Sequence, residues 1–123
     1  TVDVLVHKQL FAPGKQPMMA NFLILTGQTL KKGSILGAVS ASGKLKLSTA
    51  AAGDGSEVPV AILGEDLDTT SGDKLFAVYV EGTFNEQALV YGAGHDANSV
   101  RLNLRKVGIY LQAPRYSFVP GGA

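Results

Sequence analysis

Short apolar segments punctuated by glycine are the feature that most constrains how this chain folds. Alternating or β-branched apolar runs recur along its 123 residues, and 15 glycines and 5 prolines lie mostly between them. Runs this short with turn residues between them are typical of strands in a compact β protein. The expected strands span residues 22–26, 34–39, 44–48, 58–63, 75–81 and 109–111, with a break at Gly82 and an extended stretch over 83–85. The sequence therefore predicts a mainly β fold.

One segment has the spacing of a helix instead. Ala97, Val100, Leu104 and Val107 recur at near-helical intervals, which places them on one face. Asp96 or Asn98 is suited to cap the start, and Gly108 to end the helix. We expect a single short helix over residues 96–107.

The amino-terminal residues read as a strand that is detached from the main body. Ala12 to Pro17, with two prolines and a glycine, is turn or linker material. The apolar side chains before it have no obvious core to enter, so they need another surface to bury them. We expect residues 1–17 to form a flexible arm, 18–111 a β-rich domain and 112–123 a carboxy-terminal tail. The arm residues expected to bind a partner are Val2, Val4, Leu5, Val6, Leu10 and Phe11.

Composition narrows the classes of partner. There are 11 basic and 10 acidic residues, a formal net charge of +1, which provides no long-range attraction for nucleic acid or for an anionic membrane. The chain has no cysteine, so it has no disulfide or zinc–thiolate site. No apolar stretch is long enough to cross a bilayer, and the first residues lack the pattern of a signal peptide. We expect a soluble protein made in the cytoplasm.

A search for reactive groups finds no catalytic, cofactor-binding or metal-binding residues that we would assign. His7 and His95 lack a second ligand at metal-binding spacing, and the acidic segment over residues 65–73 lacks the order of a calcium loop. We expect no enzymatic activity and no cofactor. Two other hypotheses stay open at this point. One is a carbohydrate- or cell-surface-binding β-module that uses Tyr91 or Tyr116, and the other is a small hydrolase that uses His95 with Asp96 or Asp66.

Three segments taken together resemble the lambda-type head decoration protein family of tailed bacteriophages. They are GQTLKKGSILG over residues 27–37, DGSEVPVAILGEDLD over 54–68, and VYVEGTFN over 78–85, followed by LRKVGI over 104–109. Their order and spacing match the family over about residues 20–111.

The resemblance implies a β-clip-like fold and a structural role on the virion. It implies a homotrimer on the outer surface of the expanded phage head, at local three-fold positions, where it stabilises the shell against internal DNA pressure. The implied partners are the trimer itself and the major capsid protein, to which the amino-terminal segment adds a strand. The host would make such a late protein in its cytoplasm. Carbohydrate binding and hydrolysis are the alternatives to this capsid role.

The contact between subunits is harder to assign from one sequence. Phe84, Leu89 and Tyr91 are apolar and follow the glycine break, so we take them as candidates for the trimer interface. The competing interpretation is that they are ordinary core residues, as buried aromatic side chains usually are.

Overall fold

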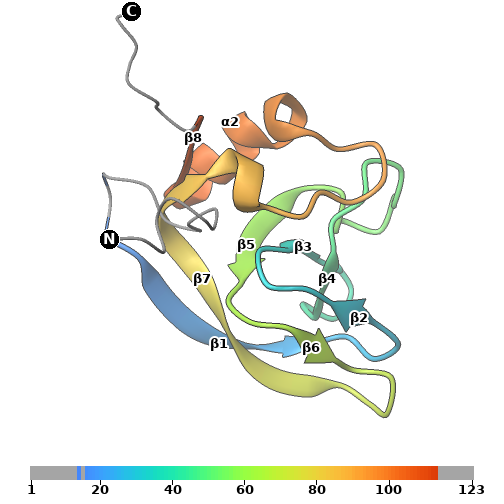
Figure 1. The fold of residues 1–123 in the computed structure, drawn as a ribbon. Coiled ribbons are helices and arrows are strands. Elements are labelled where there is room, and N and C mark those ends of the chain that lie inside the picture. The colour runs from blue at the N-terminus through green and yellow to red at the C-terminus, as the bar shows by residue number, and fades with distance from the viewer. Residues whose placement is uncertain (1–13, 15, 114–123) are drawn as a thin grey trace, which may run out of the picture.

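The computed structural model describes residue 14 and residues 16–113, which form a mainly β body with one α-helix (Figure 1). The fold class expected from the sequence is therefore confirmed. The strands are β1 (Met18–Ile24), β2 (Thr29–Leu30), β3 (Ile35–Ala38), β4 (Leu45–Leu47), β5 (Pro59–Leu63), β6 (Leu67–Asp68), β7 (Lys74–Asn85) and β8 (Ile109–Gln112). A short 3-10 helix, η1 (Glu86–Ala88), and the α-helix α2 (Ala97–Val107) lie between β7 and β8.

Six of the strands form one sheet in the order β1-β4-β3-β5-β7-β8. The sheet also curls back on itself, because β1 pairs with β7 in antiparallel register as well as with β4. The β1–β4 pairing is parallel and joins the strands at Ile24 and Leu45 only, so the barrel-like body closes over a narrow seam. The two-residue strands β2 and β6 make a separate small sheet.

Buried apolar side chains gather in two clusters. The first lies under α2, which buries Val100 and Leu104, and consists of Ile35, Ile62, Phe84, Leu89, Val100, Leu104, Ile109 and Leu111. The second lies in the barrel-like part and consists of Ile24, Leu30, Leu36, Leu45, Ala61, Leu63 and Val78. Ile62 and Leu63 are neighbours on β5 but belong to different clusters, as expected for a central strand whose side chains alternate between two buried faces.

The expected break at Gly82 is wrong, because β7 runs through it as one strand of 12 residues. Gly82 has a φ of 145°, and an added Cβ there would lie 2.9 Å from the ring of Phe84 and 3.1 Å from the Cα of Pro17. Tyr79 and Phe84 are five residues apart, yet both rings contact the first cluster and stack edge to face at 5.5 Å. Regular alternation would place them on opposite faces. The register of β7 against β1 skips Val80, because Met18 pairs with Glu81 and Met19 with Tyr79. This bulge shifts the alternation of β7 before Gly82, and the strand continues through the glycine.

The expected helix is confirmed nearly to the residue. Asp96 is its N-cap and accepts a hydrogen bond from the Ser99 N–H, while the Ser99 hydroxyl accepts one from the Asp96 N–H. Gly108 ends the helix in a left-handed conformation, with φ of 98°. Three other short elements, β2, β6 and η1, were not among the expected ones, and β1 begins at Met18, before the expected start at Phe22.

Candidate interaction surface

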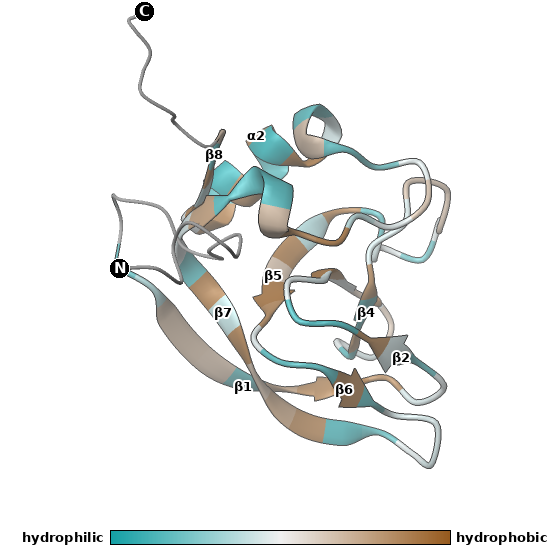
Figure 2. Ribbon diagram, viewed as in Figure 1, coloured by the Kyte–Doolittle hydropathy of each residue, from teal (hydrophilic) through white to brown (hydrophobic). Residues whose placement is uncertain are grey.

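The two long strands β1 and β7 form a ribbon that carries five of the ten exposed large apolar side chains in the described part of the chain. Figure 2 shows hydrophobic colours over much of both strands. Leu23 and Leu75 lie directly opposite each other on one face, and Phe22 and Phe76 are paired on the other. The exposed fractions lie between 39% and 67% for the members of this set, which are Met18, Met19, Phe22, Leu23 and Leu75. Because these side chains lie on both faces of the ribbon, they make β1 and its neighbour a candidate interaction element and not a single apolar patch.

The outer edge of β1 is also open. β7 pairs with β1 along one side, whereas on the other side β4 reaches it only at Ile24. Among the described residues, no strand pairs with the β1 edge between Met18 and Leu23. The sequence of β1, MMANFLI, contains no charged residue and no proline. Charge and proline are common protections of an exposed edge, and β1 has neither.

Other exposed apolar side chains are more scattered. Leu102 on α2 is 65% exposed, and Val107 and Tyr110 lie at the end of the helix and on β8. Val58 and Val90 are single exposed residues in loops. Single apolar residues on a surface are common and indicate no site by themselves.

The expected arm falls outside the described residues, so Val2, Val4, Leu5, Val6, Leu10 and Phe11 are not placed. The chain is described at residue 14 and from residue 16 onwards. Gly14 lies against the side chain of Thr83, since an added Cβ would be 2.6 Å from its Oγ1. Pro17 lies against Gly82. Gly14 and Pro17 therefore both lie against β7, just before the chain enters β1 at Met18.

The three residues considered for the trimer contact lie in or against the first core cluster of their own subunit. Phe84 is 0% exposed and Leu89 is 7% exposed. Tyr91 is partly buried, and its hydroxyl donates to the backbone oxygen of Glu86 at 2.6 Å. Burial, reinforced by the nearby Glu86 charge, raises the pKa of Tyr91 to about 12. Within the subunit these are packing positions, and a part for them in a trimer stays a prediction.

His95 joins three segments. Its Nε2 lies 3.0 Å from the backbone oxygen of Glu57 and 3.3 Å from the hydroxyl of the buried Ser48, and its Nδ1 lies 2.9 Å from the Ser99 hydroxyl. Asp96 caps the helix with its carboxylate instead of orienting the imidazole. The hydroxyl beside His95 on Ser48 has no access to a substrate because Ser48 is 0% exposed. His95 therefore links Ser48 and Glu57 to the first turn of α2.

The acidic side chains over residues 65–73 accept hydrogen bonds from backbone N–H groups of the fold. Asp66 accepts the Lys32 N–H, Asp68 accepts the Thr70 N–H, and Asp73 accepts the Thr26 N–H. Hydrogen bonds from Thr70 hold the pKa of Asp68 below its usual range, and the bond from Lys44 does the same for Asp73. Within the described residues, no three histidine or carboxylate side chains converge as a metal site would require.

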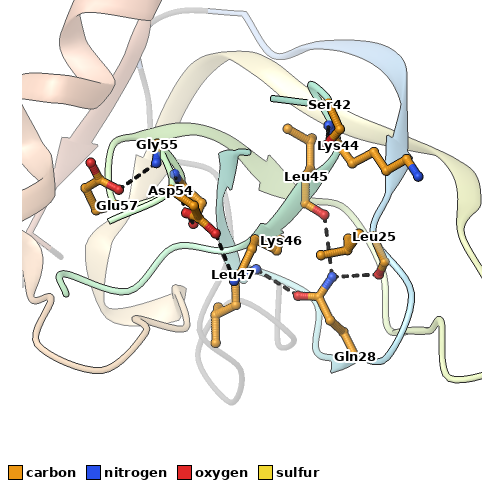
Figure 3. A network of polar contacts seen from close by, with 11 residues as sticks. Leu25, Gln28, Ser42, Lys44, Leu45, Lys46, Leu47, Asp54, Gly55 and Glu57 are labelled. Carbon is orange, nitrogen blue, oxygen red and sulfur yellow. Dashed lines mark hydrogen bonds and ion pairs between the residues drawn. The ribbon is translucent and has the colours of Figure 1, made fainter. Parts of the chain in front are cut away.

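A polar network ties the seam of the barrel to the next loop (Figure 3). The Gln28 amide nitrogen donates to the backbone oxygen of Leu25 at 2.8 Å, and its oxygen accepts the Leu47 N–H at 2.9 Å. Lys46 pairs with Asp54 at 3.3 Å. The sequence does not predict this role, because a glutamine beside a glycine carries no signal of which backbone groups its side chain reaches.

The described helices include none with the length and apolar character of a membrane span. No curated protein matches the chain. The family described as "Bacteriophage lambda head decoration protein D" does match, over residues 8–108. The matched region covers more than four fifths of the chain, including β1 to α2 in full.

The matched family consists of structural proteins of the phage head and is not a known enzyme family. The match supports a capsid decoration role and a place on the virion. The resemblance seen in three separate segments of the sequence is thereby confirmed. The chain belongs to the bacteriophage lambda head decoration protein D family.

Proposed function

We propose that this protein binds as a homotrimer to the outside of the expanded phage head, at local three-fold positions, and stabilises the shell against internal DNA pressure. The observation that carries the proposal is the family match over residues 8–108. The major capsid protein is the partner, and the trimer presents three copies of the same binding surface to it. Because three linked contacts act together, each one can be individually weak.

The amino-terminal arm, residues 1–17, makes the main contact in this proposal. Val2, Val4, Leu5, Val6, Leu10 and Phe11 supply apolar side chains for alternate pockets, while backbone hydrogen bonds add a strand to the capsid protein. The position of β1 supports this division. The first strand of the body starts at Met18, so removing residues 1–17 leaves every described strand and helix in the chain.

Stabilisation follows from linkage. A protein that binds the intact expanded shell and not its disrupted form shifts the equilibrium towards the intact shell, by about 2.7 kcal/mol per site at a free concentration 100 times the Kd. Stabilisation by binding requires no catalytic reaction, which fits a family of structural proteins.

The test uses undecorated cognate heads and two proteins, the full chain and a form lacking residues 1–17. We expect the full chain to bind expanded heads and raise their disruption temperature, and the truncated form to stay folded but not bind. Circular dichroism and light scattering check folding and oligomeric state. Failure of the full chain to bind would overturn the proposal, and binding by the truncated form would overturn the role of the arm.

A further inference from the structure

The open edge of β1 runs over six residues, from Met18 to Leu23, and contains no charged residue and no proline. β2 and β6 have two residues each, so their edges are too short to recruit a partner strand. The outer side of β8 is partly covered, because the Arg101 guanidinium donates to the backbone oxygen of Leu111 at 3.4 Å. The β1 edge from Met18 to Leu23 is neither as short as β2 and β6 nor covered in the way that β8 is.

The backbone groups on this edge point outwards in a defined pattern. The Leu25 N–H donates to the Leu45 oxygen at 2.8 Å, on the β4 side of the strand. Because backbone groups alternate between the two sides of a strand, the N–H groups of Leu23, Asn21 and Met19 point to that same side. Beyond the seam at Ile24, β4 does not reach them. They form a short row of donors and acceptors ready for another strand.

We propose that this edge of β1, from Met18 to Leu23, accepts an extended segment of the major capsid protein and so continues the capsid contact begun by the arm. This inference rests on the function proposed above. The inference adds a second binding element to the proposed capsid contact. This element lies on the folded body and not in the arm.

The position of the edge favours the capsid protein as its occupant. Met18 directly follows the arm, and Pro17 is fixed against Gly82 at the same end of the ribbon. The 13 residues before Gly14 span at most about 45 Å when extended, so any shell protein held by the arm is kept near β1. Apolar side chains on both faces of the edge add contact area, and methionine adapts well to an irregular partner surface.

A second copy of this chain fits the edge less well. Two identical edges that pair antiparallel are related by a two-fold axis and close at two copies. A trimer needs a contact between two different surfaces of the subunit. Pairing between β1 edges therefore does not produce the proposed trimer.

The experiment compares Asn21→Pro with Asn21→Ala in the full chain. Proline removes one outward N–H and is tolerated on an edge strand, whereas alanine keeps the N–H and removes the side chain. We expect Asn21→Pro to remain a folded trimer and bind undecorated heads about tenfold more weakly or worse, and Asn21→Ala to bind like the parent protein. Equal binding by a folded Asn21→Pro variant would overturn the inference.

Hydrogen exchange of the unaltered protein provides a second test, which does not depend on the folding of the variant. We expect the amides of Met19, Asn21 and Leu23 to exchange rapidly in the free trimer and to become protected on heads. Head binding without protection of these amides would overturn the edge contact and leave the proposed function intact. Protection already present in the free trimer would assign the edge to a subunit contact, and a full chain that does not bind heads would overturn the proposed function itself.

Discussion

The side-chain amide of Gln28 lies between the ends of β1 and β4 and contacts the backbone of both strands. Its nitrogen reaches the oxygens of Leu25 and Leu45, and its oxygen accepts the Leu47 N–H. Replacing it with alanine leaves a partly buried N–H without its acceptor, which costs about 1–3 kcal/mol. We expect Gln28→Ala to lower the free energy of unfolding by that amount in urea denaturation.

Gln87 provides the control for this substitution. It is exposed on η1, and only its backbone N–H is seen to bond, to the Asn85 side chain. Gln87→Ala should change the free energy of unfolding by no more than about 0.5 kcal/mol. A similar loss in both variants would show that the Gln28 bonds contribute nothing particular to the seam.

The carboxylate of Asp54 makes the stability of its loop depend on pH. Hydrogen bonds from the Ser56 hydroxyl and N–H, with support from Lys46, lower its pKa from 3.8 to about 2. A carboxylate whose pKa is lower in the folded state contributes stability above its unfolded pKa and loses it as the pH falls through the folded pKa. The contribution is therefore present above about pH 4 and disappears towards pH 2. We expect the Tm difference between the parent protein and Asp54→Asn to shrink over this range, and a constant difference from pH 5 to pH 2 would contradict the assignment.

At the scale of the elements, the start of α2 offers a direct comparison between two candidate caps. Asp96 is the N-cap, whereas Asn98 lies within the first turn and is exposed. Loss of a capping carboxylate typically costs about 0.5–2 kcal/mol. We expect Asp96→Ala to lower the free energy of unfolding by about 1 kcal/mol and Asn98→Ala to leave it nearly unchanged. Equal losses in thermal or urea unfolding would remove the special role of Asp96.

The elements that sequence reasoning predicted well are those that local signals define. The helix has its cap, its apolar spacing and its terminal glycine within a single short segment. The first half of β1 was missed because Met18 to Asn21 is neither β-branched nor alternating, and becomes a strand through pairing with β7. The open edge of β1 could not be predicted at all, since it depends on how far along the strand β4 reaches.

The continuation of β7 through Gly82 is another feature that only the assembled sheet reveals. Glycine predicts a break, but β7 continues through Gly82 at a φ of 145°, and the register shift at Val80 brings Phe84 to the side of Tyr79. An alanine at this position would be strained at φ 145° and would press against the Phe84 ring and Pro17. We expect Gly82→Ala to lower the free energy of unfolding by about 2 kcal/mol or more, measured by urea denaturation. A neutral effect would mean that the backbone there relaxes without cost.

At the scale of the whole molecule, the buried side chains of the sheet belong to two separate core clusters. One side of β5 and the far half of β7 pack under α2, while the other side fills the barrel-like part. Phe84 is the largest fully buried side chain and links β7 to the first of these clusters. The long ribbon of β1 and β7 carries five of the ten exposed large apolar side chains among the described residues. Both ends of the body therefore have a core of their own, and the edge of β1 stays unpaired over Met18 to Leu23 among the described residues.

The two roles considered for Phe84 predict different outcomes when it is replaced. If its main role is in the core, Phe84→Ala creates a cavity and lowers the free energy of unfolding by about 3–5 kcal/mol. If its main role is in the trimer, the variant stays folded but dissociates. Burial at 0% exposure favours the first outcome.

Leu102→Ala is the matched control, because Leu102 is apolar but 65% exposed, and its loss should cost less than about 0.5 kcal/mol. Urea denaturation with light scattering separates the outcomes, and a folded monomeric Phe84→Ala protein would move Phe84 to the interface between subunits.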